Sequence, residues 1–96
     1  MRGPVGRPRR RRHIRFSPRA KFFKPRGVPM RGLEVIELTT EEVEALRLKN
    51  IKELDQNKCA QLMKTSQSTF QRILTSAYKK ISQAVVQGKS INIVKK

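Results

Sequence analysis

Several residue types that build common sites are scarce in this 96-residue chain. It has one cysteine and one histidine, so an internal disulfide is excluded and no Cys/His zinc cluster is indicated. No apolar run is long enough for a transmembrane helix, and no apolar segment of a secretory signal follows the basic start. The length of 96 residues predicts one small domain, and these absences predict a cytoplasmic protein that carries no metal or other cofactor.

Acidic residues are also scarce, and they are confined to one segment. Residues 1–32 hold 12 Lys and Arg and no acid, residues 34–55 hold all 7 acids with 3 basic residues, and residues 56–96 hold 8 basic residues and no acid. The net charge of +16 therefore divides into +12, −4 and +8. A charge this large is tolerated mainly where phosphates neutralise it, so the expected partner is a polyanion.

The composition divides the chain into a basic arm and a compact domain. Residues 1–32 contain all five prolines and four of the five glycines, which predicts a largely extended or disordered arm. Residues 33–96 hold 19 Leu, Ile, Val and Phe, enough for a small core. No Ser-His-Asp set, Gly-rich phosphate loop or inward carboxylate pair is visible, so we expect no enzyme.

The domain is expected to be mainly α, with the N-cap candidates Thr39, Asp55 and Ser66 at the starts of the helices. Apolar periodicity predicts three helices, the third of them long, over about 40–50, 56–63 and 67–87. Thr39 and Glu42 form a capping box before the first helix, and Gly88 ends the third. Residues 33–38 and 90–94 are the candidates for a minimal two-stranded β-ribbon.

Residues 56–74 have the spacing of a helix-turn-helix. Ala60 is the small residue that lets two helices cross closely, and four side chains would wedge between them: Cys59, Met63, Phe70 and Ile73. Lys64 stands in the turn where glycine is common, and a left-handed backbone there costs a non-glycine residue about 1 kcal/mol. Either the turn differs slightly, or Lys64 accepts this strain and gains a phosphate contact.

The helix after this turn would carry the contacts to DNA. Gln and Arg form bidentate hydrogen bonds with base edges in the major groove. The residues expected at base edges are Gln67, Ser68, Gln71 and Arg72, and those expected at phosphates are Thr69 and Lys64. The competing interpretation is a solvated helix face, but such a face normally carries Glu as well as Lys, and residues 56–96 contain no acid.

The arm supplies a second signal. Residues 6–9, Gly-Arg-Pro-Arg, resemble the core of AT-hook minor-groove binders, although Val5 stands where a full hook would have Arg. The competing interpretation is a generic basic tail, which adds affinity for DNA but no sequence selectivity. Under both, the arm residues expected on phosphates or in the minor groove are Arg7, Arg9, Arg10, Arg11 and Arg12.

Three ordered motifs resemble those of a known family: residues 23–29 (FKPRGVP), 38–48 (LTTEEVEALRL) and 66–74 (SQSTFQRIL). The chain resembles a small prokaryotic family of uncharacterised predicted DNA-binding proteins whose helix-turn-helix is similar to region 4 of sigma factors. This resemblance implies a DNA-binding, regulatory protein. Family members usually have Gly at the position of Lys64 and an acid-rich helix where this chain has Gln56, Asn57 and Lys58.

The expected function is a DNA-binding transcriptional regulator located at the nucleoid. Two alternatives stay open: an RNA-binding or ribosome-associated basic protein, and a protein–protein adaptor of the transcription machinery. The adaptor would use an acidic surface on the first helix, formed by Glu41, Glu42 and Glu44. The expected partner is double-stranded DNA, and further candidates are RNA polymerase and a second copy of the chain bound through residues 81–86.

Overall fold

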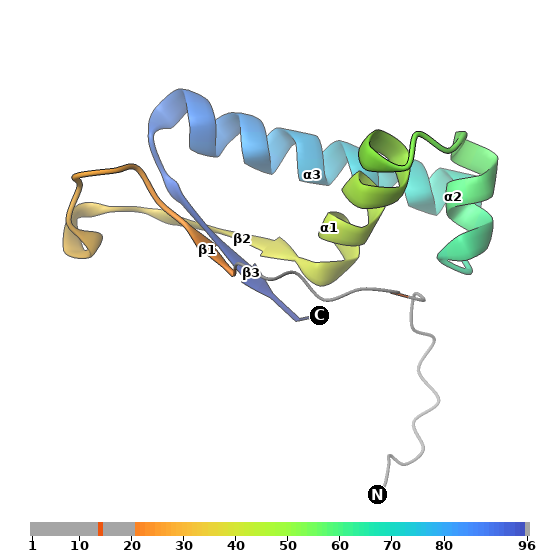
Figure 1. The fold of residues 1–96 in the computed structure, drawn as a ribbon, viewed down its shortest axis with the longest axis horizontal. Coiled ribbons are helices and arrows are strands. Elements are labelled where there is room, and N and C mark those ends of the chain that lie inside the picture. Colours follow the sequence, from red (N-terminus) through yellow and green to blue (C-terminus); the bar gives the residue numbers. More distant parts are fainter. Residues whose placement is uncertain (1–13, 15–20, 96) are drawn as a thin grey trace, which may run out of the picture.

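The computed structural model describes Ile14 and residues 21–95, which form three α-helices and a three-stranded sheet (Figure 1). The α-helices are α1 (Thr40–Leu46), α2 (Gln56–Leu62) and α3 (Gln67–Gln87). The strands are β1 (Phe22–Phe23), β2 (Val35–Thr39) and β3 (Ser90–Val94), and a short 3-10 helix, η1 (Met30–Gly32), precedes β2. The three predicted helices are confirmed.

The sheet has one strand more than the predicted ribbon. β3 lies in its centre, pairs in parallel with β2 from Val35↔Ser90 to Thr39↔Val94, and pairs antiparallel with β1. The pairing between the segments around 33–38 and 90–94 is therefore confirmed, but the two-stranded ribbon is wrong. β1 has only two residues, too few to show the alternation of apolar and polar residues that identifies a strand in a sequence. It forms because β3 provides its hydrogen-bond partners.

The predicted helix boundaries follow from local caps. Thr39 and Glu42 form the predicted capping box: each accepts a backbone N–H of the other, at 3.1 and 2.9 Å. Asp55 caps α2 and Ser66 caps α3, each by accepting the N–H of the residue three positions later. Gly88 ends α3 with a left-handed φ of 69°. Short-range hydrogen bonds thus fix where all three helices begin.

The first helix changes its hydrogen-bond pattern before it ends. α1 continues directly into a π-helix, η2 (Arg47–Ile51), in which the N–H of Lys52 donates to the carbonyl of Arg47 at 2.9 Å. The predicted helix over 40–50 therefore consists of two segments. In η2 the side chain of Leu48 is buried, whereas Ile51 is 75% exposed.

The core lies where α1, η2, α2 and α3 meet. Its buried members are Ala45, Leu48, Cys59, Ala60, Met63, Phe70, Ile73 and Leu74. The four side chains predicted to wedge between the second and third helices are all among them, and Ala60 is buried at the same junction. Burial raises the pKa of the Cys59 thiol, in keeping with its predicted role as a small buried hydrophobic residue.

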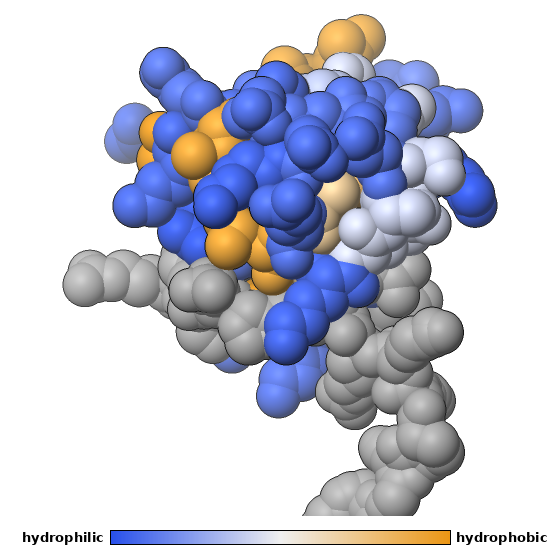
Figure 2. All heavy atoms as spheres, turned by 90° about the vertical axis from the view of Figure 1, so that its right-hand side faces the viewer, coloured by the Kyte–Doolittle hydropathy of each residue, from blue (hydrophilic) through white to orange (hydrophobic). Residues whose placement is uncertain are grey.

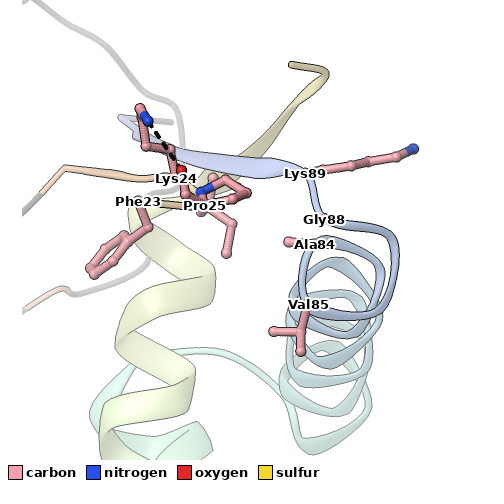
Figure 3. Close-up of a pocket in the computed structure, with 8 residues that line it drawn as sticks. Phe23, Lys24, Pro25, Ala84, Val85, Gly88 and Lys89 are labelled. Carbon is pink, nitrogen blue, oxygen red and sulfur yellow. Dashed lines mark hydrogen bonds between the residues drawn. The ribbon is translucent and has the colours of Figure 1, made fainter. Parts of the chain in front are cut away.

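The second half of α3 is less covered than the first. In Figure 1 it extends past α1 and α2, and there Val85 and Val86 are 74% and 81% exposed. Val85 borders a shallow hollow between the end of α3 and the segment of Phe23 and Pro25 (Figure 3). Val85 continues the apolar spacing of Ala77 and Ile81 in the sequence, which predicts an inward side chain, and this prediction is wrong. Self-association through residues 81–86 stays a prediction.

Within the described residues, no helix combines the length and the apolar character that crossing a membrane requires. The same part of the chain holds no cluster of three or more His, Cys, Asp and Glu side chains arranged to bind a metal ion.

Candidate nucleic-acid interface

The connection between α2 and α3 is a tight turn over residues 63–66. The N–H of Thr65 donates to the carbonyl of Ala60 at 3.0 Å, and the N–H of Lys64 donates to that of Gln61 at 3.1 Å. This pair of bonds is a Schellman motif, in which glycine usually takes the residue with positive φ. Lys64 has a φ of 58°, so the turn keeps its usual geometry and Lys64 adopts the left-handed conformation.

Replacing Lys64 with glycine is expected to raise the free energy of unfolding by about 0.5–1 kcal/mol, because glycine removes the left-handed strain at a smaller cost in chain entropy. Urea denaturation measures the change. Lys64→Ala is the matched control, since it removes the same charge but keeps the β-carbon, and it is expected to leave stability unchanged. Equal stabilisation by both substitutions would show that charge, not backbone strain, is responsible.

The four residues predicted to contact base edges share one exposed face at the start of α3. Their positions differ by one, three and one, which places them on the same side of neighbouring helical turns. All four are exposed: Gln67, Ser68, Gln71 and Arg72. The structure therefore brings the predicted base-contact set together at the helix end that follows the turn.

The residues predicted at phosphates differ in their surroundings. Lys64 is exposed in the turn. Thr69 is half-buried, and its Oγ1 accepts a hydrogen bond from the Ser66 hydroxyl at 3.0 Å, so a phosphate would share this oxygen with the cap. The predicted arm contacts, Arg7 and residues 9–12, lie outside the described residues.

Two neighbouring side chains that the sequence did not single out contact the predicted set. Nε2 of Gln67 donates to Oδ1 of Asn57 on α2 at 2.9 Å, and Nε2 of Gln71 donates to Oγ1 of Thr75 at 3.0 Å. The second pair has the i, i+4 spacing of a helix and was visible in the sequence as such. The first pair depends on how α2 crosses α3, which no local pattern specifies.

The surroundings of this face are basic. No acid occurs in the sequence from 56 to 96, and the exposed cations of α2, the turn and α3 are Lys58, Lys64, Arg72 and Lys79. Asp55, just before α2, has its carboxylate bonded to the N–H of Lys58 at 2.8 Å. The end of the molecule that carries α2 is mostly hydrophilic, with a few apolar patches (Figure 2). A polyanion would therefore meet little repulsion from α2, the turn or α3.

Further along α3, Glu42 joins α1 to the middle of this helix. Its Oε2 accepts from the Ser76 hydroxyl at 2.5 Å, and its Oε1 accepts from Nζ of Lys80 at 2.9 Å. Burial by itself raises the pKa of Glu42, but the hydrogen bonds from Ser76, the Thr39 N–H and Lys80 outweigh it, so this pKa lies below its ordinary value. The ammonium of Lys80 is thus bonded within the domain, while 30% of its side chain stays exposed.

Glu44 is fully buried, and its two oxygens accept from Nε and Nη2 of Arg47 at 2.8 and 3.0 Å. The hydrogen bond to this carboxylate raises the pKa of Arg47. Since Glu42 is also buried, these two acids are unavailable for the contact surface that the adaptor alternative requires. The sequence alone predicted one surface with three acids. It could not show that α3 packs over Glu42 or that Glu44 is buried and bonded to Arg47.

Together these features define a small helical domain with a three-stranded sheet and an acid-free, exposed helix face. The chain belongs to the family described as "Protein of unknown function DUF134", which matches residues 1–96. The predicted resemblance to an uncharacterised family is confirmed to this extent.

Curated relatives of the chain are named only as UPF0251 proteins. One from Desulforudis audaxviator (strain MP104C) is 48% identical over 89 residues, which are 93% of this chain and 58% of the relative. One from Halothermothrix orenii is 42% identical over 87 residues, covering 91% of this chain and 64% of the relative. One from Caldanaerobacter subterraneus subsp. tengcongensis is 48% identical over 87 residues, covering 91% and 74%. This chain therefore spans less than two thirds of the first two relatives. No solved structure matches it significantly.

Proposed function

We propose that α2 and α3 form a helix-turn-helix that binds duplex DNA, with the start of α3 in the major groove. The observation that carries this proposal is the exposed, acid-free set of residues on the first turns of α3: Gln67, Ser68, Gln71 and Arg72. A glutamine amide matches the N6 and N7 edge of adenine, and a guanidinium matches O6 and N7 of guanine. This set therefore has the donors and acceptors that sequence-selective binding needs.

Affinity and selectivity come from different residues in this proposal. The exposed lysines at positions 58, 64 and 79, together with the arginines of the arm, neutralise phosphates and make binding depend on salt. The side chains at base edges add the choice of sequence. The role proposed for this protein is regulation of transcription at the nucleoid.

Duplex DNA is favoured over RNA by the shape of the binding face. A helix enters the wide major groove of B-form DNA, whereas the major groove of A-form RNA is too deep and narrow for side-chain contacts. Proteins that bind single strands stack bases on aromatic side chains. Tyr78 is the one aromatic residue on the exposed surface of α3, and its hydroxyl is bonded to Asn50.

The test is a gel-shift competition. The protein is bound to a labelled pool of DNA duplexes at two salt concentrations and is challenged with unlabelled duplex DNA or structured RNA of the same length. Duplex DNA is expected to displace the label at lower concentration than RNA, and affinity is expected to fall as salt rises. More effective displacement by RNA would contradict the proposal and favour the RNA-binding alternative.

A further inference from the structure

The side-chain amide of Gln67 is held by α2 before any ligand binds. Its Nε2 donates to Oδ1 of Asn57 at 2.9 Å, across ten positions of sequence and between two different helices. Both residues are exposed. The contact is therefore a hydrogen bond at the surface rather than a part of the core, and α2 limits the orientations that Gln67 adopts.

This hydrogen bond leaves the chemistry of Gln67 usable. An amide nitrogen carries two hydrogens, so one N–H of Gln67 and its Oε1 remain. These are the donor and acceptor that pair with N7 and N6 of adenine. A long side chain fixed in advance loses less rotamer freedom on binding, and the preference for the matching base is larger as a result.

Gln71 is arranged in a similar way. Its Nε2 donates to Oγ1 of Thr75 at 3.0 Å, one turn further along α3. Both glutamines of the exposed face thus use one N–H to bond a neighbouring side chain. The neighbour of Gln71 lies on the same helix, whereas the neighbour of Gln67 lies on α2, so each can be removed without disturbing the other.

We infer that Asn57 is a positioning residue: through its hydrogen bond it fixes the Gln67 amide for contact with adenine at one base pair of the DNA site. This inference rests on the proposed function. Asn57 acts through Gln67 and adds no base contact of its own. This base pair is identified by experiment as the position at which Gln67→Ala loses the preference for adenine.

The test uses duplexes that differ only at that base pair. In Asn57→Ala the preference for adenine is expected to fall by about 3- to 10-fold, while affinity for an unrelated duplex stays unchanged. Asn57→Asp keeps the acceptor for Gln67 and is expected to retain the preference, although its negative charge weakens binding to every duplex. Thr75→Val is the matched control, because it removes the partner of Gln71 and leaves the base pair of Gln67 unaffected. Asn57 is exposed and alanine favours helix, so the variant is expected to fold.

The outcomes separate this inference from the proposed function. Wild-type protein that shows no base preference at any position would overturn both. A wild-type preference that Asn57→Ala leaves intact would overturn the role of Asn57 alone. The double variant Asn57→Ala/Gln67→Ala is expected to match Gln67→Ala, since a positioning residue has no effect without the side chain it positions. A further loss in the double variant would instead show that Asn57 contacts the DNA itself.

Discussion

At pH 7, Glu42→Gln is expected to lower the free energy of unfolding by about 1.5–3 kcal/mol, the range for hydrogen bonds to a charged group. The carboxylate of Glu42 is buried between α1 and α3 and accepts from the Ser76 hydroxyl, Nζ of Lys80 and the N–H of Thr39. Glutamine has one acceptor oxygen in place of two and no charge to balance Lys80. Helix capping and the contact between helices are therefore weakened together.

The same residue makes stability depend on pH in a defined direction. The folded-state pKa of Glu42 is lowered. The stability that its carboxylate contributes is therefore fully present above the unfolded-state pKa of about 4.3, and it is lost as pH falls through the lower folded-state pKa. The difference in stability between the wild type and Glu42→Gln is therefore expected to shrink below that pH.

Urea denaturation of both proteins from pH 7 to pH 3 measures this difference. Glu37→Gln is the matched control, since Glu37 is exposed on β2 and is expected to change stability by no more than about 0.5 kcal/mol. A difference between the wild type and Glu42→Gln that stays constant over the whole range would contradict the assigned role of the carboxylate.

Arg72→Ala is expected to weaken binding to the preferred duplex by roughly 5- to 150-fold, which corresponds to the 1–3 kcal/mol of one bidentate base contact. Arg72 is exposed on the second turn of α3, beside Gln71 and one turn after Ser68. Its loss removes the proposed base contact, so the variant is also expected to lose its preference at one base pair. Equilibrium binding to the preferred and a scrambled duplex at one fixed salt concentration measures both effects.

Lys79→Ala serves as the comparison for Arg72→Ala. Lys79 is exposed further along α3 and is expected to contact phosphate, so its removal weakens binding to both duplexes by the same factor. If Arg72→Ala, like Lys79→Ala, weakened binding to the preferred and the scrambled duplex by the same factor, Arg72 would act only through its charge. It would then have no role in selecting the DNA sequence.

The sequence was sufficient to predict those parts of the structure that depend on short-range signals. The capping box of Thr39 and Glu42, the N-caps Asp55 and Ser66 and the stop at Gly88 each depend on a few neighbouring residues. The apolar spacing from 59 to 74 likewise identified side chains that the core buries. The four exposed residues of the candidate face followed from the same helical period, because what does not point inward on such a helix points to solvent.

Contacts between distant segments were not predictable in this way. β1 forms because β3, about 70 residues later, pairs with it. Glu42 and Lys80 are 38 positions apart and are joined only by the packing of α1 on α3. The bond between Asn57 and Gln67 depends on how α2 crosses α3. In each case one side chain or strand acquires its role from a partner that no local pattern identifies.

Selection of binding sites from a library of randomised DNA duplexes tests the central claim most directly. The wild-type protein is expected to enrich a short common sequence that contains an adenine and a guanine within one major-groove segment, matching a glutamine and Arg72 on adjacent turns of α3. Arg72→Ala is expected to lose the preference for guanine. Repeated selection that enriches no common sequence would contradict the proposal that α3 selects DNA sites.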